Sequence, residues 1–468
     1  MDLLAELTSI LGTPHVLIGP DTAPYATDWT GKYTGAPLAV LRPADTAQVS
    51  EVMRLAHDTG TPVVTVSGNT GLAGGTFADG ALMLSTERMN RIEEIRPDAR
   101  IAIVGAGVIL SQMHDAAAEH GLAFPVTFGA RGSARIGGIL STNAGGSNVL
   151  RYGNTRALCL GVEAVLADGR VLNLMTELHK DNTGYDLRDL LIGSEGTLAV
   201  ITRAVLKLVE APRAHVTAMV AVPALPDALV LLNRLQAETG GAVQAFEFMP
   251  DSYIRQHMAR FPDARAPFAE SHAVNVLMEV GATAPRDTTP EADGSIPIVT
   301  QMENTLAALM EDGRVLDAVV ATSEAQRAEM WARREAAAEV GMGRKPAIVT
   351  DIAVPLDRVA TFLDRMNGEL ARMDAGAEVN VVSHLGDGNV HYVVWPTSQD
   401  PDAQDAIVER VEDVVLSLGG SFSAEHGVGL SKKPSMARRK DPVALDVMRT
   451  IKAALDPKGI LNPGKLLP

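Results

Sequence analysis

The chain has 468 residues, 46% of them hydrophobic, which is enough for two or three folding units with large cores. Its formal net charge is −16, from 57 acidic and 41 basic residues, and phosphate repulsion argues against nucleic acid or an anionic membrane as a partner. The one cysteine, Cys159, excludes an internal disulfide and a thiolate metal cluster, and its apolar neighbours predict a buried free thiol. We find no apolar run long enough to span a membrane and no basic signal peptide, so we expect a cytoplasmic protein.

Short β-rich segments alternate with helical segments along the first two hundred residues, and the pattern restarts after Pro212. Runs of apolar and β-branched residues predict strands at 38–41, 62–66, 81–84, 101–104, 216–222, 274–280 and 317–321. Apolar residues at helical spacing predict helices at 46–59, 111–120, 227–239, 356–373 and 442–455. A stretch rich in proline, threonine and acidic residues predicts a surface loop at 281–297.

Three glycine-rich segments occur in the first part of the chain, at 67–76, 132–146 and 193–198. Glycine lets backbone N–H groups approach phosphate oxygens, and the Ser, Thr and Asn residues of these segments add hydrogen-bond donors. One such segment taken alone is more often a tight turn than a ligand site. Three of them, with no Gly-x-Gly-x-x-Gly near the N-terminus, favour a large dinucleotide held by several loops, FAD, over a Rossmann site.

The three segments, together with 180–187 and the residues up to Ile201, resemble the FAD-binding domain of the vanillyl-alcohol oxidase/p-cresol methylhydroxylase superfamily. Within it, the chain resembles the group formed by D-lactate dehydrogenase, D-2-hydroxyglutarate dehydrogenase and the glycolate oxidase flavoprotein subunit. The resemblance extends from about Pro37 to Lys465. It implies an α+β fold in three parts. These are a two-part FAD-binding domain of the p-cresol methylhydroxylase type (1–210), an α+β substrate or cap domain with a central antiparallel sheet and the metal hairpin (211–415), and a C-terminal segment that returns to the FAD domain (416–468).

The resemblance also implies how FAD is held. The first segment surrounds the pyrophosphate, and the other two enclose the ribityl chain and the isoalloxazine ring. Some members tether the flavin to a His or Cys, but Ser67, Gly68 and Asn69 stand in this loop, so we expect non-covalent FAD. Asn462 resembles a C-terminal flavin-side motif, although a turn after a helix would also explain it. The residues expected to contact FAD are Gly68, Asn69, Thr70, Gly71, Leu72, Gly75, Thr76, Gly132, Ser133, Gly137, Gly138, Thr142, Asn143, Ala144, Gly145, Gly146, Glu195, Gly196, Thr197, Ile201 and Asn462.

A pair of histidines flanks a turn sequence further along the chain. Two β patterns surround residues 386–389, and a loop of these residues would place His384 directly opposite His391. Opposed residues share a face, with Cβ atoms about 4.5–5.5 Å apart, so the imidazoles can share a metal ion. Glu425 is the candidate third ligand, because a carboxylate that completes a two-histidine site leaves positions for substrate. Either histidine alone is more often a half-buried polar residue; the paired register and the Glu425-His426 dipeptide favour the metal site.

The family resemblance implies the same ligands, with zinc as the first choice of divalent cation and manganese as the alternative, and it makes His426 the general base. The expected reaction begins when the cation binds the hydroxyl and one carboxylate oxygen of the substrate and lowers the pKa of the hydroxyl. His426 accepts the hydroxyl proton, and a hydride passes from Cα to flavin N5. Arg334 matches the substrate arginine of a Trp-x-x-Arg motif, and its planar guanidinium suits a carboxylate. We expect the neighbouring Arg333 on a solvated helix face.

Three residues of this sequence differ from those of one branch of the group, and these differences restrict the choice of substrate. Sequences that resemble D-2-hydroxyglutarate dehydrogenase carry Thr, Lys and Asn where this chain has Ala338, Val349 and Val393. A second carboxylate would lose partners at these positions, which favours D-lactate or a larger D-2-hydroxy monocarboxylate. Arg344 or Lys345 could still meet a distal carboxylate, so D-2-hydroxyglutarate stays open.

Three other functions are compatible with parts of the pattern. A phenol or sugar-alcohol oxidase of the same superfamily would need no metal, and the paired histidines argue against it. A flavoprotein subunit of a glycolate-oxidase-like complex remains open, although a full set of base, ligands and arginine indicates a catalytic chain. That set also argues against a non-enzymatic FAD-binding protein. The expected partners are a small 2-hydroxy acid and an electron acceptor such as electron-transfer flavoprotein or a quinone, with a homodimer as one candidate assembly.

Overall fold

The computed structural model describes residues 2–468, and the described chain divides into two compact units. The first unit contains the chain up to Gly146 together with Gly153–Glu210 and Glu425–Pro468. The second contains Ser147–Tyr152 and Ala211–Ala424, and therefore extends beyond residue 415, where the sequence analysis ended the middle domain. Within the described residues, we find no helix with both the length and the apolar character that a bilayer crossing demands.

One sheet of the first unit has four strands in the order β1 (Val16–Leu17), β2 (Ala39–Leu41), β4 (Leu82–Ser85) and β3 (Val63–Val66). β2 and β3 both run parallel to β4, and the helix α2 (Thr46–Thr59) makes the crossover between β2 and β3. Asp45 caps this helix by accepting the N–H of Gln48, and Gly60 ends it in the left-handed conformation. The helix predicted at 46–59 is confirmed.

A second sheet of the first unit has five antiparallel strands, in the order β5 (Ile92–Arg96), β6 (Ile101–Gly105), β10 (Val200–Lys207), β8 (Cys159–Val165) and β9 (Val171–Leu174). Cys159 at the start of β8 is buried, and burial raises the pKa of its thiol to about 12, so the predicted buried free thiol is confirmed. The other elements of this unit are α1 (Leu3–Leu11), α3 (Leu110–Ala118), α4 (Ile136–Ser141), α6 (Leu187–Leu191), α15 (Lys433–Arg439), α16 (Pro442–Leu455) and the short strand pair β7 (Leu122–Ala123) and β11 (Val209–Glu210).

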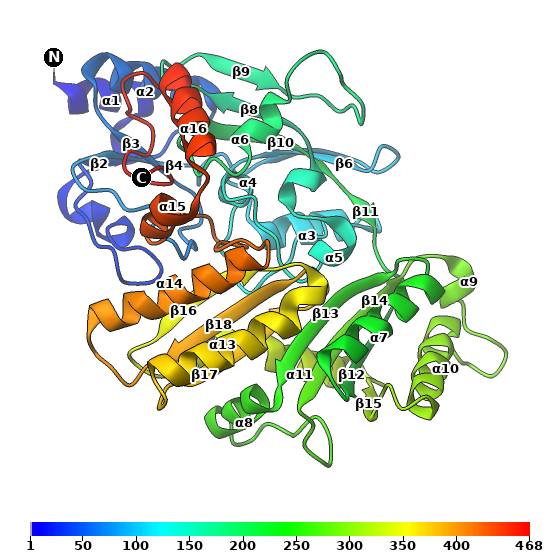
Figure 1. Ribbon diagram of the computed structural model, residues 1–468. Coiled ribbons are helices and arrows are strands. Elements are labelled where there is room, and N and C mark those ends of the chain that lie inside the picture. The colour runs from blue at the N-terminus through cyan, green and yellow to red at the C-terminus, as the bar shows by residue number, and fades with distance from the viewer. Residues whose placement is uncertain (1) are drawn as a thin grey trace. The chain divides into compact units, whose positions relative to one another are not determined.

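The second unit is built on a seven-stranded sheet whose neighbours are all antiparallel, as the sequence analysis expected (Figure 1). Its strands lie in the order β15 (Asp317–Val320), β12 (Ala214–Val222), β14 (Val274–Ala282), β13 (Val243–Pro250), β17 (Glu378–His384), β18 (Asn389–Trp395) and β16 (Ile348–Ala353). The segment predicted as a loop at 281–297 contains the end of β14 and the short helix α9 (Pro285–Thr288).

Helices cover both faces of this sheet. One face packs against α7 (Leu225–Glu238), α10 (Pro297–Glu311), α13 (Val359–Met373) and α14 (Pro401–Ser417), of which α13 and α14 lie side by side in Figure 1. The opposite face packs against α8 (Asp251–Arg260), α11 (Glu324–Glu335) and α12 (Ala337–Gly341). Side chains alternate along a strand, so Val381 and Tyr392 join the first core and Val382 joins the second. The face covered by α11 also carries Glu247, His384 and His391, which belong to the candidate site described below.

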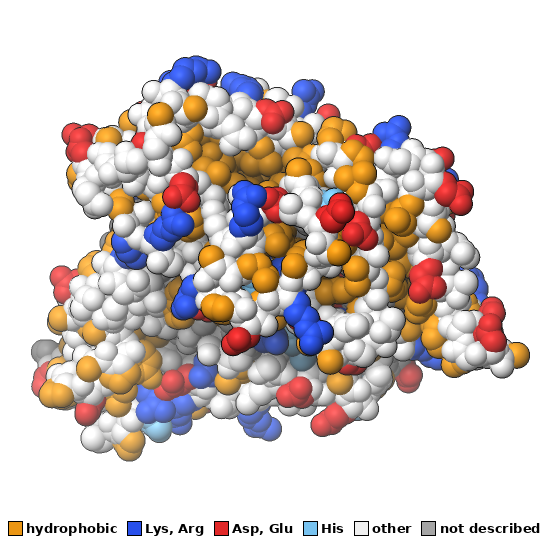
Figure 2. All heavy atoms as spheres, turned by 90° about the horizontal axis from the view of Figure 1, so that it is seen from below, with side chains coloured by type: hydrophobic (Ala, Val, Ile, Leu, Met, Phe, Trp, Pro, Cys, Tyr) orange, Lys and Arg blue, Asp and Glu red, His pale blue; other side chains and the backbone are white. Residues whose placement is uncertain are grey.

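Figure 2 shows a face on which Lys and Arg side chains lie scattered among acidic and apolar ones. Proteins that bind nucleic acid present clustered basic side chains along a groove or a helix. On the face that Figure 2 shows, the charged side chains of the described residues are interspersed instead.

Candidate active site

The glycine-rich segments of the first unit meet one another and the C-terminal part of the chain. A Cβ added to Gly68 would lie 2.3 Å from the carbonyl oxygen of Ser133, so the first two segments approach through their backbones. The side-chain amide of Asn462 donates to the carbonyl oxygens of Gly75 at 3.1 Å and Glu195 at 2.7 Å. Residues predicted to contact FAD from all three segments therefore lie close together, with Asn462 linking the first and the third.

Residues with a strained backbone conformation are concentrated in these glycine-rich segments and in the C-terminal part of the chain. Seven described residues other than glycine have a positive φ. Five of them are predicted site residues, with φ angles of 49° at Asn69, 50° at Asn143, 53° at Glu195, 64° at His426 and 42° at Asn462. Such conformations cost about 1–3 kcal/mol each and persist where the surrounding structure imposes them, often at ligand sites. Their concentration here favours a binding site over a set of unrelated turns.

The carboxylate of Glu195 holds the loop that follows His426. It accepts the N–H groups of Val428 and Gly429, each at 2.7 Å. A Cβ on Gly427 would lie 2.7 Å from this carboxylate, so only glycine fits there. Burial raises the pKa of Glu195, and the two N–H groups oppose that rise. The side chain of Glu195 thus fixes the backbone next to the predicted base, while its carbonyl oxygen faces Asn462.

The two histidines of the predicted metal site lie on neighbouring strands of the second unit. His384 on β17 pairs with Asn389, and His391 on β18 pairs with Val382. The predicted register, with His384 directly opposite His391, is therefore wrong. Moving a partner by two positions keeps a side chain on the same face, so the imidazoles still meet. Their ring centroids are 5.2 Å apart, with an angle of 76° between the ring planes.

The turn between these strands explains the different register. The carbonyl oxygen of His384 accepts the N–H groups of Asp387 at 3.2 Å and Gly388 at 3.1 Å. Gly388 has a φ of 81°, and its N–H closes the turn one residue earlier than predicted. The side chain of Asp387 accepts the N–H of Asn389 at 3.1 Å. Residues 385–388 therefore form the loop, and β18 begins at Asn389.

Each imidazole of the pair faces a buried carboxylate through Nδ1. Nδ1 of His384 lies 2.9 Å from Oε1 of Glu247, and Nδ1 of His391 lies 3.4 Å from Oδ1 of Asp351. The side chains of Glu247 and Asp351 are 1% and 4% exposed. Metal-binding histidines commonly donate their second ring N–H to such a carboxylate. The donor set therefore fits a cation held through the Nε2 atoms.

The electrostatics of this group also suit ligation. Burial lowers the pKa of His391, although its hydrogen bond with Asp351 acts in the opposite direction. Burial alone would raise the pKa of Glu247, but His384 and Arg334 hold it below its ordinary value. A neutral His391 and an ionised Glu247 follow, and a neutral imidazole is the form that binds a metal ion.

Arg334, the predicted substrate arginine, lies in the same group. Its Nε donates to Oε2 of Glu247 at 2.7 Å, and its Nη2 lies 3.3 Å from Nε2 of His384. The structure therefore brings Arg334 beside one of the predicted metal ligands. Arg333 was expected on a solvated face, and this prediction is wrong. Arg333 is 3% exposed and donates to the carbonyl oxygen of Arg265 at 2.7 Å, because the loop after α8 covers this side of α11.

A second carboxylate fixes α11 on the sheet. Glu279 on β14 accepts hydrogen bonds from Arg327 and Trp331, which are one helical turn apart, with donor–acceptor distances of 2.8–2.9 Å. It also accepts the hydroxyl of Thr217 at 2.6 Å. Burial alone would raise the pKa of Glu279, but the hydrogen bonds from His215 and Arg327 hold it far below its ordinary value. This saturated carboxylate anchors the helix that carries Arg334.

Glu425 and His426 follow directly on Ala424, the last residue of the second unit. The N–H of Ala424 donates to the carbonyl oxygen of Asp351 at 3.1 Å, so this end of the unit is tied to β16. Glu425 and His426 belong to the first unit, whereas the paired histidines belong to the second. Nε2 of His426 lies 3.9 Å from the carboxylate of Glu425.

Two of the three positions that bear on the substrate lie on the histidine-bearing face of the sheet, and the third, Ala338, lies on α12. Val349 on β16 pairs directly with Val393 on β18, two residues beyond the second histidine. Arg344 donates to Glu378 at 2.7 Å, and its guanidinium carbon lies 4.4 Å from the ring centre of Trp395, which follows Val393 by two residues on β18. An apolar pair therefore stands at two positions where the sequence analysis expects Lys and Asn in a D-2-hydroxyglutarate dehydrogenase.

Comparison with family models assigns both parts of the chain. Residues 37–175 match the FAD binding domain model, and residues 211–466 match the model described as FAD linked oxidases, C-terminal domain. The second match alone covers more than half of the chain. The chain is an FAD-linked oxidase family member. The superfamily resemblance and the predicted fold class are thereby confirmed.

Curated relatives of this FAD-linked oxidase align over almost its full length. D-2-hydroxyglutarate dehydrogenase of Xanthomonas citri pv. viticola is 37% identical, over 95% of this chain and 92% of its own. The enzyme of Stutzerimonas stutzeri is 33% identical over 99% and 98%, and the mitochondrial enzyme of Bos taurus is 34% identical over 100% and 84%. Among solved structures, p-cresol methylhydroxylase with substrate bound superposes with a TM-score of 0.74 at 17% identity, covering 99% of this chain and 96% of its own. At that identity it shows the shared fold alone.

The first unit of this FAD-linked oxidase has the features that an FAD site needs. A Cβ added to Gly71, Gly75 or Gly132 would meet no atom within 4 Å, so space lies beside these loops. Oγ1 of Thr65 and Oδ1 of Asn462 are buried without a hydrogen-bond partner. Buried polar atoms are almost always satisfied, and a bound ligand is one way to satisfy them. The residues of the first unit therefore fit the cofactor that the family binds.

Sequence reasoning missed several residues of this arrangement. Glu247 and Asp351 face the paired histidines, and Thr65 and Asn462 both lie close to Gly196. Glu247 gave a usable signal, because it is a lone acid between Phe246 and Phe248 in an apolar strand. A buried acid in such a strand needs a cationic or hydrogen-bonding partner.

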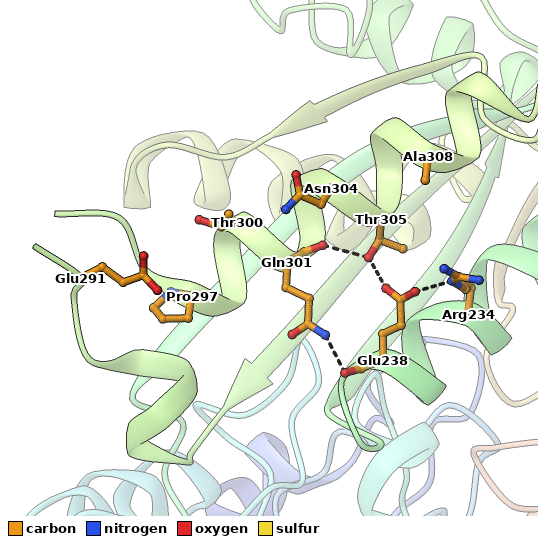
Figure 3. Close-up of a pocket in the computed structure, with 9 residues that line it drawn as sticks. All are labelled: Arg234, Glu238, Glu291, Pro297, Thr300, Gln301, Asn304, Thr305 and Ala308. Atoms are coloured by element: carbon orange, nitrogen blue, oxygen red, sulfur yellow. Dashed lines mark hydrogen bonds and ion pairs between the residues drawn. The ribbon is translucent and has the colours of Figure 1, made fainter. Parts of the chain in front are cut away.

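A surface pocket of about 420 Å³ lies between α7 and α10 of the second unit (Figure 3). Its polar groups bind one another: Gln301 donates to the carbonyl oxygen of Glu238, and Thr305 and Arg234 both contact the Glu238 carboxylate. The pocket is lined by Arg234, Glu238, Glu291, Pro297, Thr300, Gln301, Asn304, Thr305 and Ala308. It contains none of the predicted site residues, so it offers no support for catalysis.

Proposed function

We propose that this FAD-linked oxidase dehydrogenates a D-2-hydroxy acid to the 2-keto acid. The observation that carries the proposal is the polar group on one face of the second unit's sheet. There, two imidazoles backed by carboxylates lie beside a buried guanidinium. A cation held by histidines and an arginine next to it suit a substrate that carries a hydroxyl beside a carboxylate. A phenol has no carboxylate for that arginine, which disfavours the phenol oxidase alternative.

In the proposed reaction, bound FAD supplies the two-electron acceptor for the hydride from Cα. A divalent cation, zinc in the first place, would be held by His384, His391 and Glu425 and would lower the pKa of the substrate hydroxyl. Arg334 binds the substrate carboxylate and orients Cα. His426 accepts the hydroxyl proton, and the hydrogen bonds from the loop after it to Glu195 hold its backbone in place.

The favoured substrate is D-lactate or a larger D-2-hydroxy monocarboxylate. Val349 and Val393 support this choice, because an apolar pair would leave a distal carboxylate without partners. D-2-hydroxyglutarate is the second candidate, and the names of the curated relatives favour it. The proposed electron acceptor is electron-transfer flavoprotein or a quinone.

A substrate panel tests this assignment. We expect metal-dependent dye reduction with D-lactate or a longer D-2-hydroxy monocarboxylate, and none with L-lactate. The double variant V349K/V393N should shift the ratio of kcat/KM values toward D-2-hydroxyglutarate by about 10–100-fold, since a hydrogen bond to a charged group contributes about 1.5–3 kcal/mol. A wild-type preference for D-2-hydroxyglutarate would contradict the monocarboxylate proposal and leave the reaction type standing.

Substitutions of two loop glycines test where FAD binds. A methyl group at Gly75 meets no atom within 4 Å, so Gly75→Ala should leave the melting temperature of the FAD-free protein unchanged but reduce the flavin content. A methyl group at Gly68 would lie 2.3 Å from a backbone oxygen of Ser133, so Gly68→Ala should lower that melting temperature by roughly 4–8 °C. Flavin absorbance per protein and thermal unfolding distinguish the two effects. Full flavin content in Gly75→Ala would mean that this loop does not enclose the cofactor.

A further inference from the structure

We infer that Glu247 is a positioning residue that sets the tautomer of His384 and the orientation of Arg334 with one carboxylate. The inference rests on the proposed function, which gives His384 to the metal ion and Arg334 to the substrate. It assigns a role to a residue that is not a proposed metal ligand, base or substrate arginine. Through its two carboxylate oxygens, this residue connects the proposed metal site with the arginine that would bind the substrate.

The strand pairing places Glu247 where it can reach both partners. Glu247 on β13 pairs directly with His384 on β17, so their side chains rise from the same face of the sheet. Arg334 approaches that face from α11. Oε1 lies 2.9 Å from Nδ1 of His384, and Oε2 lies 2.7 Å from Nε of Arg334. Each oxygen of the carboxylate is thus used by a different functional residue.

The carboxylate determines which ring nitrogen of His384 carries the proton. An ionised carboxylate only accepts hydrogen bonds, so Nδ1 of His384 must be the donor. Nε2 of the neutral ring is then the unprotonated atom, which is the form that ligates a cation. Nη2 of Arg334 lies 3.3 Å from that Nε2. Because Nε of Arg334 is directed at Glu247, the guanidinium plane is fixed beside the ligand position.

A purely structural role for Glu247 is less consistent with its surroundings. The task of fastening α11 to the sheet is already performed by Glu279, one strand away, through Arg327 and Trp331. The carboxylate of Glu247 is instead hydrogen-bonded to His384 and Arg334, which are both predicted site residues. Both carboxylates are buried and bonded to α11, so Glu279 provides a matched control for the loss of a buried ion pair.

The test compares Glu247→Gln with Glu279→Gln in the full-length, FAD-loaded protein. The neutral amide can accept from only one of the two partners of Glu247. We expect Glu247→Gln to weaken Zn²⁺ or Co²⁺ binding by roughly 10–100-fold, as loss of such supporting carboxylates does elsewhere. It should also raise KM for the D-2-hydroxy acid. Glu279→Gln should lower the melting temperature, while the metal affinity of the folded protein stays within about twofold of wild type.

Histidine ¹⁵N NMR of the metal-free protein gives a readout that needs neither turnover nor metal. In wild type, His384 should show an unprotonated Nε2, and Glu247→Gln should shift or mix the tautomers. Glu247→Asp retains the charge and covers the case in which the glutamine variant does not fold; it should keep more of the Nδ1–H tautomer than glutamine does. Wild-type metal affinity, KM and tautomer in a folded Glu247→Gln variant would overturn the inference. If wild type binds no metal, the proposed metal site fails, and the NMR result still decides the role of Glu247.

Discussion

Replacing His426 with asparagine should lower the rate of flavin reduction by a D-2-hydroxy acid by about 10²–10⁴-fold, the usual contribution of a positioned general base. Asparagine is the suitable replacement because position 426 has a φ of 64°, and asparagine tolerates that left-handed conformation better than most residues. FAD should remain bound, because the side-chain contacts of Asn462 and Glu195 in the first unit are unchanged. Anaerobic stopped-flow absorbance of the flavin measures this step directly.

The control for this experiment is His179→Asn, which changes an exposed histidine in the first unit. It should reduce flavin at the wild-type rate. The flavin spectrum and melting temperature of His426→Asn should match those of wild type, which would attribute the rate loss to proton transfer. A His426→Asn variant that reduces flavin at the wild-type rate would show that another group accepts the hydroxyl proton.

Local patterns in the sequence were sufficient for much of the fold. The helix at 46–59 was predicted to the residue, because its apolar spacing is bounded by a capping Asp45 and a terminating Gly60. The histidine pair was placed correctly on one face of a hairpin even though its register was wrong. Side chains alternate strictly along strands, so the face survives a shift of two positions. The predicted register was wrong, because the several turn-forming residues between His384 and His391 allow more than one loop of four residues.

The parts that the sequence did not reveal depend on partners far apart in the chain. Glu247 reaches His384 and Arg334 across 137 and 87 positions of sequence. Arg333 was misjudged for the same reason, because the loop that buries it follows a different helix. Periodicity within one element reports which face of that element is apolar, but it does not report which polar groups arrive from elsewhere. The supporting residues of a site are therefore harder to find than its motif residues.

Removal of the proposed divalent cation should reduce turnover on the order of 10³-fold, because a metal ion contributes several kcal/mol of charge stabilisation and 1.36 kcal/mol corresponds to a factor of ten. Dialysis against a chelator should cause the loss, and Zn²⁺ or Mn²⁺ should restore the rate. The flavin should stay bound, because the glycine-rich loops belong to the first unit and the paired histidines to the second. His391→Ala should have the same effect and resist rescue by added metal.

The matched control is His272→Ala. His272 belongs to the same unit and also faces a carboxylate, with Nε2 at 3.6 Å from Asp317, but it has no second histidine beside it among the described metal-binding groups. This variant should retain its metal and its rate, because one imidazole and one carboxylate seldom hold a catalytic cation. Full activity of both the chelated enzyme and His391→Ala would mean that the histidine hairpin is a structural feature. In that case the substrate hydroxyl would have to be activated by His426 and Arg334 alone.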